Sequence, residues 1–476
     1  MRAVHTLRLL LLAQKHSDLN LFDPIFLIPS FCRSVISCST PWIRLTALGL
    51  MLGFGWMASS RAAEPVQPVT PADISALDEM AAREMLLKPP AKSGMIRLAG
   101  FELFPRVSSS IMYDDNINIQ SGAAQQSDLI WSLSPGANVL AGNPGVEIPP
   151  GVTFEGLRYL SRQPDISFSG TPAKMLLFNY SPTFKLFARH DNYNSIDQLA
   201  QLTGIYSFSR LILGLDQDYS KSLDTVADVG ARTTSTYFTT RLTSMYQLSD
   251  RTSVEVNGQY RNTSYEDPRF TGSRQWENQN WINRQLSGKV NAGLGLTLGY
   301  WDVDRSGSQT YQQAVLRMIY RLAEKMDVTA SVGGEWRQYS SGAPGTWDPI
   351  FKIGANYRPL DSTTISVEGH RFQQSSASSG SQNYTETGFS CNVRQRVFEK
   401  WFANLGGSYW TVDYHAAQSG ISVSRFDTYY AARVGLDYQF TERWSVGAYY
   451  QHRSDSSNVS FGFENNQVGV QGSWQF

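Results

Sequence analysis

Hydrophobic and polar residues alternate without a break along Gln467–Phe476 (QVGVQGSWQF). One side carries Val468, Val470, Trp474 and Phe476, and the other carries Gln467, Gln471, Ser473 and Gln475. Because successive side chains of a strand point to opposite faces, this pattern predicts a strand with one apolar and one polar face. Such a strand, about ten residues long, is typical of the wall of a transmembrane β-barrel. A half-buried edge strand of a soluble sheet has the same pattern, so the rest of the chain must decide.

The same period of two recurs in longer segments. In 290–300, Leu294, Leu296 and Leu298 share a face opposite three glycines, and 253–261, 328–337 and 430–440 alternate in the same way. These segments are longer than the five or six residues usual for a strand of a globular protein. Aromatic residues repeatedly close the apolar face near a strand end, where the aromatic girdle of a membrane barrel lies.

Two kinds of connection alternate between these segments. Short polar turns occur at Ser249-Asp250, Glu324-Lys325, Glu399-Lys400 and Glu442-Arg443. Long stretches rich in Ser, Gly, Asn and Asp occupy 189–198, 221–232, 265–274, 303–311, 339–349, 373–384, 413–427 and 453–466. Short turns on one rim and long loops on the other are typical of outer-membrane barrels, in which the short turns are periplasmic.

The predicted fold is all-β, a transmembrane antiparallel β-barrel of about eighteen strands, with sixteen as the nearest alternative. An even count places both barrel termini in the periplasm. One irregular segment, 141–172, is long where a short turn is expected; it could hang into the periplasm, fold into the lumen as a constriction, or be a tolerated insertion. We expect strands near 102–120, 127–140, 173–189, 198–209, 210–221, 231–248, 251–265, 273–286, 288–303, 311–322, 326–339, 348–358, 363–373, 384–397, 401–413, 426–440, 443–453 and 466–476.

The region before the barrel has a different character. Residues 44–63 read as a secretory signal, with Arg44 ahead of an apolar stretch and small residues before Ala63 or Glu64; a transmembrane anchor is the alternative. The expected organisation is therefore 1–63 as N-terminal extension and signal peptide, 64–100 as a periplasmic lead-in segment, and 101–476 as the barrel. The lead-in could dock a partner, plug the pore or serve as a tether.

Composition agrees with a barrel. Only 17% of the 476 residues are charged and 12% are aromatic, and the mean hydropathy of −0.30 argues against a helical membrane protein. The formal net charge of zero argues against a nucleic-acid partner, because such proteins usually carry a basic excess. After cleavage at the signal only Cys391 would remain, so neither a disulfide framework nor a cysteine metal cluster is expected.

Several segments resemble the putative β-barrel porin 2 family of outer-membrane proteins, some of which are found beside exopolysaccharide synthesis genes. The similar segments cover most of 101–476, and the likeness breaks at 141–172 and over 1–100. Export of polysaccharide is the most that the resemblance implies, with outer-membrane lipid and a periplasmic export protein as implied partners. The motifs are LFPRVSSSIMYDDNI (103–117), NYSPTFKLFARHDNYNSIDQ (179–198), FSRLILGLDQDYS (208–220), VGGEWRQY (332–339), TERWSVGAYYQHR (441–453) and NNQVGVQGSWQF (465–476).

Motifs for catalysis are weak, and we expect no enzyme activity, cofactor or metal. Asp114 and Asp115 could form part of a Ca²⁺ site at the loop rim, but a solvated strand end explains them better, because adjacent strand residues point in opposite directions. No recognisable nucleophile motif flanks the histidines of the mature chain (His190, His370, His415 and His452). The glycines that begin at Gly293 have the spacing of a strand and not of a phosphate loop.

The polar strand faces supply the candidate pore lining, in which arginine predominates. Such side chains could select anions, or could pair with carboxylates across strands and stiffen the wall. Inward aromatic residues (Trp301, Phe402, Trp410 and Tyr449) could stack on sugar rings or simply fill space. The candidates are Arg241, Glu255, Arg261, Arg317, Arg321, Glu335, Arg337, Lys352, Arg358, Glu368, Arg394, Arg396, Arg433 and Asp437.

The expected function is that of an outer-membrane channel of a Gram-negative bacterium, passing anionic or sugar-rich solutes or exporting exopolysaccharide. Two alternatives belong to other classes. One is a closed structural or adhesive barrel that binds a partner through its long loops, and the other is an enzyme in the barrel wall, such as a lipase.

Overall fold

The computed structural model of the protein describes residues 96–98, 100–143, 174–226, 228, 231–323, 325–441, 443–459 and 462–475. They all belong to one compact unit, Met57–Phe476. Among these residues, no helix has both the length and the apolar character needed to cross a membrane. The predictions for 1–63, for nearly all of the lead-in 64–100, and for 144–172 lie outside the described residues and stay predictions.

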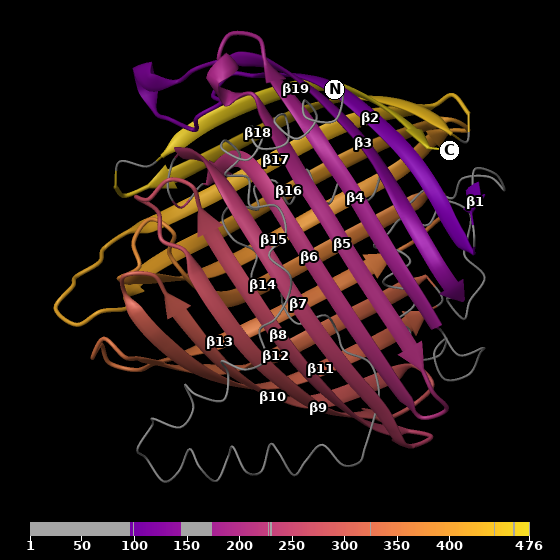
Figure 1. The fold of residues 1–476 in the computed structure, drawn as a ribbon, viewed down its shortest axis with the longest axis vertical. Coiled ribbons are helices and arrows are strands. Elements are labelled where there is room, and N and C mark those ends of the chain that lie inside the picture. Colours follow the sequence, from indigo (N-terminus) through magenta and orange to yellow (C-terminus); the bar gives the residue numbers. More distant parts are fainter. Residues whose placement is uncertain are drawn as a thin grey trace, which may run out of the picture. The chain divides into compact units, whose positions relative to one another are not determined.

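Nineteen strands form one antiparallel sheet that closes on itself (Figure 1). Eighteen of them, β2 to β19, build the barrel wall, which confirms the predicted fold class and count. The strands are β1 (Ile96–Leu98), β2 (Phe101–Asp114), β3 (Asp128–Asn143), β4 (Lys174–Phe187), β5 (Ser195–Ser207), β6 (Leu211–Val226), β7 (Ala231–Ser249), β8 (Thr252–Tyr265), β9 (Ser273–Gln285), β10 (Val290–Val303), β11 (Gly307–Ala323), β12 (Met326–Tyr339), β13 (Thr346–Tyr357), β14 (Thr363–Ser375), β15 (Gln382–Phe398), β16 (Trp401–Ala416), β17 (Phe426–Gln439), β18 (Trp444–Ser457) and β19 (Phe463–Gln475). Within the described residues there are also two short 3-10 helices, η3 (Gly122–Ala124) and η4 (Asp191–Tyr193).

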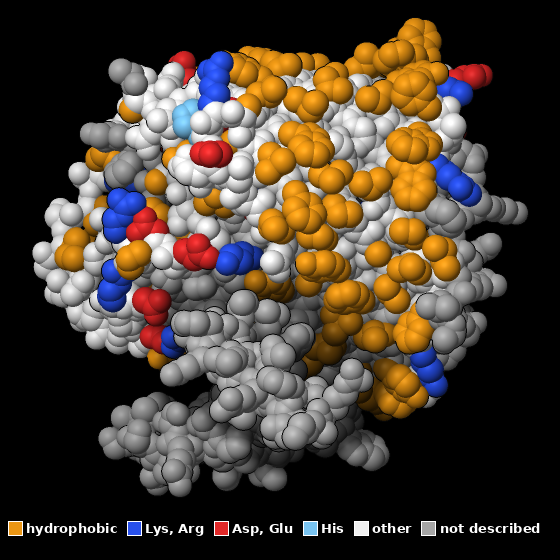
Figure 2. Space-filling view, turned by 45° about the horizontal axis from the view of Figure 1, so that its top comes forward, with side chains coloured by type: hydrophobic (Ala, Val, Ile, Leu, Met, Phe, Trp, Pro, Cys, Tyr) orange, Lys and Arg blue, Asp and Glu red, His pale blue; other side chains and the backbone are white. Residues whose placement is uncertain are grey.

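Period-two alternation separates the outer face of the barrel from its lumen. In β10, Leu294 and Leu296 are about 60% exposed, whereas Thr297 and Trp301 on the opposite face are buried. Leucine on the outside and polar residues within is the reverse of a soluble protein, and it is the arrangement required of a wall in contact with lipid. Figure 2 shows hydrophobic side chains over the strands of one face, while acidic side chains gather mainly on the left, where Figure 1 places the long loops.

Aromatic residues form belts at both ends of this apolar face. Near the long loops, Trp276 contacts Tyr260 and Tyr300 on the neighbouring strands, with ring centroids 5.3 and 5.6 Å apart. Near the short turns, Trp401 and Phe440 both contact Tyr438. Ten residues separate Tyr430 in one belt from Phe440 in the other. That is about 33 Å along a strand, or about 25 Å after a tilt of about 40°, which matches the apolar band of membrane barrels.

The alternation of short turns and long loops is also confirmed, with differences at the strand ends. The first barrel strand was predicted over 102–120, but β2 ends at Asp114. Ile117 and Ile119 continue the apolar alternation, yet both lie buried inside a loop, and Ile119 has a positive φ of 49° that a strand does not allow. The loop predicted at 303–311 is shorter, because β11 already begins at Gly307.

The barrel closes where the last strand, β19, pairs with the first wall strand, β2. At the long-loop end of this seam, the buried carboxylate of Asp114 accepts hydrogen bonds from the side chains of Asn465 (2.5 Å) and Gln467 (2.8 Å). Asp115 accepts from the backbone and side chain of Asn466, on the other face. The two adjacent carboxylates do point apart as predicted, but they are bound to the last strand and do not form a solvated strand end.

One strand pair is only partly formed. β13 and β14 pair from Phe351 with Arg371 down to Tyr357 with Ile365, so 346–350 of β13 have no ladder on the β14 side. Side chains bridge this stretch: Arg371 Nε donates to the Pro349 carbonyl (3.2 Å), and its guanidinium lies 3.5 Å from Asp348. The backbone ladder between β13 and β14 is therefore interrupted at its long-loop end.

Candidate functional site

Loops reach across the long-loop end of the barrel and bind to distant strands. The β2–β3 loop is bound on one side by Arg232 of β7, whose guanidinium donates to the Ile117 carbonyl (2.8 and 3.1 Å). The β14–β15 loop is bound by Thr271 of the β8–β9 loop, whose backbone N–H donates to the Ala377 carbonyl (2.8 Å). These contacts narrow the outer mouth of the barrel.

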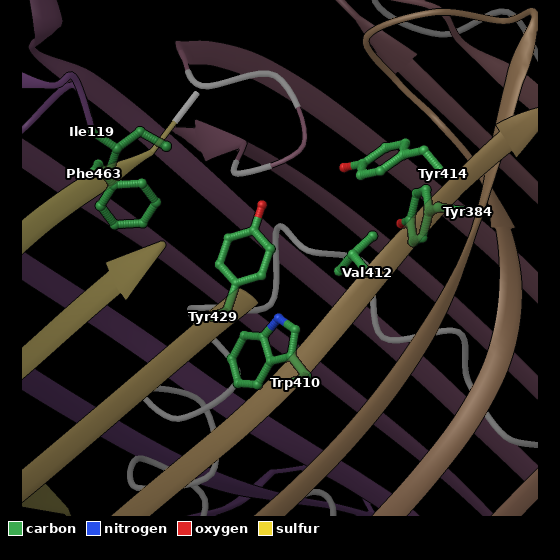
Figure 3. Packing of buried hydrophobic residues seen from close by; sticks show 7 residues of the cluster. All are labelled: Ile119, Tyr384, Trp410, Val412, Tyr414, Tyr429 and Phe463. Carbon is green, nitrogen blue, oxygen red and sulfur yellow. The ribbon is translucent and has the colours of Figure 1, made fainter. Parts of the chain in front are cut away.

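A buried hydrophobic cluster holds the other side of the β2–β3 loop (Figure 3). Ile119 lies beside Phe463 of β19, and the cluster continues over β15, β16 and β17. Two aromatic pairs build its far part: Tyr384 with Tyr414, and Trp410 stacked on Tyr429, with ring centroids 5.3 and 5.8 Å apart. The loop is thus fixed to strands on both sides of the mouth. The remaining member of the cluster is Val412.

Asp228, between β6 and β7, is the acceptor at the centre of a buried polar cluster. Its carboxylate accepts from the Ser376 hydroxyl (2.9 Å), the Ala377 N–H (2.6 Å) and the Tyr414 hydroxyl (2.8 Å). Arg425 donates to its carbonyl (2.9 Å) and also binds Asp427 (2.6 Å). Burial alone would lower the pKa of Arg425, but the hydrogen bond to Asp427 and the nearby carboxylates raise that pKa above its usual value.

Four of the predicted lumen residues form two buried ion pairs. Arg317 Nη2 lies 2.7 Å from Glu255 Oε2, and Arg337 Nη2 lies 2.6 Å from Glu335 Oε1. All four side chains are at most 3% exposed. Arg317 reaches Glu255 across two intervening strands and also donates to Asn283 Oδ1 on the way. The pairs neutralise these arginines and stiffen the wall.

Glycines in β10 allow large neighbouring side chains to lie flat on the inner wall. A Cβ on Gly295 would be 2.4 Å from the Trp281 ring, and one on Gly299 would be 1.9 Å from the Tyr311 ring. The arginines stack in turn: the Arg317 guanidinium is 4.0 Å from the Trp281 ring centroid, and that of Arg337 is 5.1 Å from Tyr311. The wall here is a layer of rings covered by guanidinium groups.

A hollow lies over this wall, between β9 and β14. Tyr311 links its polar groups, since it donates to Glu277 (2.5 Å) and accepts from Gln275 (2.6 Å), and Gln279 donates to Glu277 as well (2.8 Å). The residues that line the hollow are Gln275, Glu277, Gln279, Trp281, Thr297, Trp301, Tyr311, Gln313, Val315, Arg317, Ser331, Glu335, Arg337, Ile350, Phe351, Arg371, Phe372 and Gln373.

The other predicted lumen residues are spread around the wall and do not join this hollow. Arg241 donates to Gln259 (2.9 Å), and Asp437 accepts from Asn404 (2.7 Å). Arg396 is exposed at the turn end of β15. The guanidinium of Arg433 lies 3.8 Å from the Tyr449 ring, that of Arg394 lies 5.0 Å from Phe402, Glu368 pairs with Lys352 (3.2 Å), and Arg261 is half-buried on the face of Glu255. Arg321 takes part in the ladder opposite Asp327.

Sequence reasoning missed Asp228, Gln275, Gln279, Trp281 and Tyr311. Period two in the predicted strand 273–286 would have placed Gln275, Gln279 and Trp281 on one face, but Asp228 lies in a loop without any periodic signal.

Three of the four histidines in the described part of the chain have carboxylate or amide partners. His190 binds Asp128 (2.8 Å), His370 binds Glu386 (2.9 Å) and His452 binds Asn466 (2.9 Å). These contacts give no support to a Ser–His catalytic pair. No group of three or more metal-ligating side chains is present in the part of the chain that the structure describes.

Residues 300–476 match the family described as "Putative beta-barrel porin 2". The resemblance seen in the sequence is confirmed over these residues. The C-terminal part, from the end of β10 to β19, thus supplies an independent sign that this is a porin-like barrel of the outer membrane. No curated protein matches the sequence.

Several crystal structures resemble the porin-like barrel described here. Pseudomonas aeruginosa OpdO is 10% identical, with 79% of this chain and 97% of that chain covered at a TM-score of 0.41. P. aeruginosa OccK2 (OpdF) is also 10% identical, with 81% and 100% covered at 0.42. Acinetobacter baumannii OccAB4 is 9% identical, with 79% and 98% covered at 0.41. Because these TM-scores are below 0.5, the fold rests on the strand pairing of this chain itself.

Proposed function

We propose that this chain is an outer-membrane channel that passes uncharged, sugar-rich solutes, among them segments of an exported polysaccharide. The observation that carries the proposal is the pairing of lumen arginines with carboxylates. Around the hollow, Arg317, Arg337 and Arg371 lie beside Glu255, Glu335 and Asp348. A wall of paired charges has little net field with which to concentrate small anions, but it offers many hydrogen-bonding groups to hydroxyls.

The pore-lining role of the candidate residues predicted from the sequence belongs to the same proposal. Arg317, Glu335 and Arg337 line the hollow and Glu255 pairs with Arg317, whereas the other candidates would line the remaining wall. In a channel of this kind, the inward arginines would present hydrogen-bond donors to the solute at a fixed orientation and spacing, and would not concentrate anions. Anion selectivity, the other expectation from the sequence, would require guanidinium groups without carboxylates beside them.

A closed barrel that binds a partner through its loops is the second candidate. It is favoured by the contacts across the mouth, in which Arg232 binds the Ile117 carbonyl and Thr271 binds the Ala377 carbonyl. Such contacts would block large solutes for as long as they hold. A channel reconciles both observations only if these loop contacts can open.

The test is single-channel recording of the purified protein in a planar bilayer, with a KCl gradient to measure ion selectivity. The proposal expects steady open steps, weak selectivity between K⁺ and Cl⁻, and reversible block by a neutral glucose hexasaccharide. Strong anion preference without block by the hexasaccharide would overturn the uncharged-solute assignment. A folded, heat-modifiable barrel that never conducts would favour the closed, partner-binding barrel instead.

A further inference from the structure

Five buried polar atoms of uncharged side chains around the hollow between β9 and β14 find no hydrogen-bond partner among the described residues. Two are donors, the indole N–H groups of Trp281 and Trp301, and three are acceptors, the amide oxygens of Gln275, Gln279 and Gln373. Their residues are between 4% and 7% exposed, and all five line the same hollow. A buried donor or acceptor without a partner is destabilising, so a concentration of them in one place calls for an explanation.

The local hydrogen-bond network fixes the direction of these acceptors. The amide nitrogen of Gln275 is used by the Tyr311 hydroxyl, and that of Gln279 is used by Glu277. Their amide oxygens are thereby left as acceptors. The indole rings are likewise held in place, since Trp281 lies between Gly295 and the Arg317 guanidinium. The unpartnered groups are therefore pre-oriented and do not turn away to find other partners.

The charges around the hollow oppose one another and do not single out an anion. Arg317, Arg337 and Arg371 lie beside the carboxylates of Glu255, Glu335 and Asp348. The remaining carboxylate, Glu277, lies within electrostatic reach of Arg241 and Arg261. The site thus offers neutral donors and acceptors within a wall of opposed charges.

We propose that this hollow is a binding site for one or two units of an uncharged saccharide, whose hydroxyls accept from the indoles of Trp281 and Trp301 and donate to the three glutamine oxygens. A hydroxyl can both donate and accept, so a polyol satisfies a mixed set of this kind, whereas a carboxylate satisfies only the donors. The flat layer of rings and guanidinium groups suits the flat faces of sugar rings. This inference rests on the proposed channel function and names the site at which the solute is recognised.

The test is binding of the neutral glucose hexasaccharide to purified protein, measured by calorimetry in detergent, for the parent and for Trp281→Phe and Trp301→Phe. Each replacement keeps an aromatic ring but removes the N–H donor together with the five-membered part of the indole, and the control variant makes the same change elsewhere in the lumen. Loss of one neutral hydrogen bond should weaken binding about 3- to 10-fold, and the double variant should weaken it by about the product. Trp410→Phe is the matched control, because Trp410 is also a buried lumen indole with an unpartnered N–H, but it lies outside the hollow.

The outcomes separate the site from the channel. Weaker binding in both hollow variants, with Trp410→Phe unchanged and all three heat-modifiable, supports the site. If the parent conducts and binds the hexasaccharide but the hollow variants bind it equally well, the site is wrong and the channel stands. If the parent neither conducts nor binds, the proposed function fails along with the site. Tighter binding of glucuronate than of the neutral sugar would overturn the uncharged class.

Discussion

The ion pair between Glu255 and Arg317 decides whether the lumen arginines act mainly on stability or on selectivity. We consider Glu255→Gln, Arg317→Met and the double replacement. Breaking a buried ion pair by removing one partner typically costs about 3–5 kcal/mol, because the other charge stays buried without compensation. Replacing both partners should cost far less than the sum of the single replacements, which makes the coupling energy about 3 kcal/mol or more.

The structure supports the upper part of this range. The two charged atoms are 2.7 Å apart, and the side chains are 3% and 0% exposed. In Glu255→Gln, Arg317 would keep its contacts to Asn283 and Trp281 but would lose the Glu255 carboxylate. In Arg317→Met, the carboxylate would keep only the amide of Asn257, at 2.6 Å, among its hydrogen bonds described here.

The assay is equilibrium unfolding by urea in thin-bilayer vesicles, followed by tryptophan fluorescence and by gel mobility without heating. Lys221 and Glu266 supply the control, because they are also 2.7 Å apart but are 37% and 61% exposed. The same cycle on this exposed pair should yield about 0–1 kcal/mol. If the free energies of unfolding of the single variants lie within about 1 kcal/mol of the parent, or if the two single effects add up to that of the double variant, water screens the Glu255–Arg317 pair. The reversal potential of Glu255→Gln should move toward anion preference.

Two further changes probe how the wall is built. Asp114→Ala removes the carboxylate that accepts three hydrogen bonds at the β2–β19 seam, and we expect it to lower the free energy of urea unfolding by about 3 kcal/mol. Asp115 is only half-buried, so Asp115→Ala should lower that free energy by less. Equal losses in the two variants would contradict the burial of the seam. Gly299→Val would displace the Tyr311 ring and cost about 1–3 kcal/mol by overpacking, whereas Gly258→Ala, with nothing within 4 Å of the added carbon, should stay within about 0.5 kcal/mol in the same assay.

Strand positions were predictable because side chains alternate between the outer face and the lumen in strand after strand. The segment 326–339 was predicted with both ends correct, and Glu335 and Arg337 on its polar face do lie inside. The rule fails where a loop copies the alternation, as at Ile117 and Ile119, which are buried against other loops and strands rather than in the wall.

The contacts within the candidate site could not be predicted in the same way. Glu255 and Arg317 are 62 residues apart in the sequence, with two strands between them in the wall. Gly293 on one of the intervening strands leaves room for the Arg317 side chain to pass, because a Cβ there would lie 3.1 Å from Arg317 Nε. Which carboxylate a given arginine reaches depends on strand register, and that is set by turn geometry as well as by the hydrophobic pattern. The sequence likewise does not show which indole and amide groups of the hollow lack a hydrogen-bond partner, because that depends on the contacts between strands.

The incomplete ladder between β13 and β14 limits how deeply the barrel can be immersed. In hydrocarbon, each backbone N–H or C=O without a partner costs several kcal/mol, whereas at headgroup level water can bind it. Trp347, 63% exposed on the outer face, marks the headgroup level within this very stretch, 346–350. A thicker bilayer would draw this stretch into hydrocarbon. We therefore expect the height at which β13 and β14 separate, as well as the length of the strands, to limit the bilayer thickness that suits the protein.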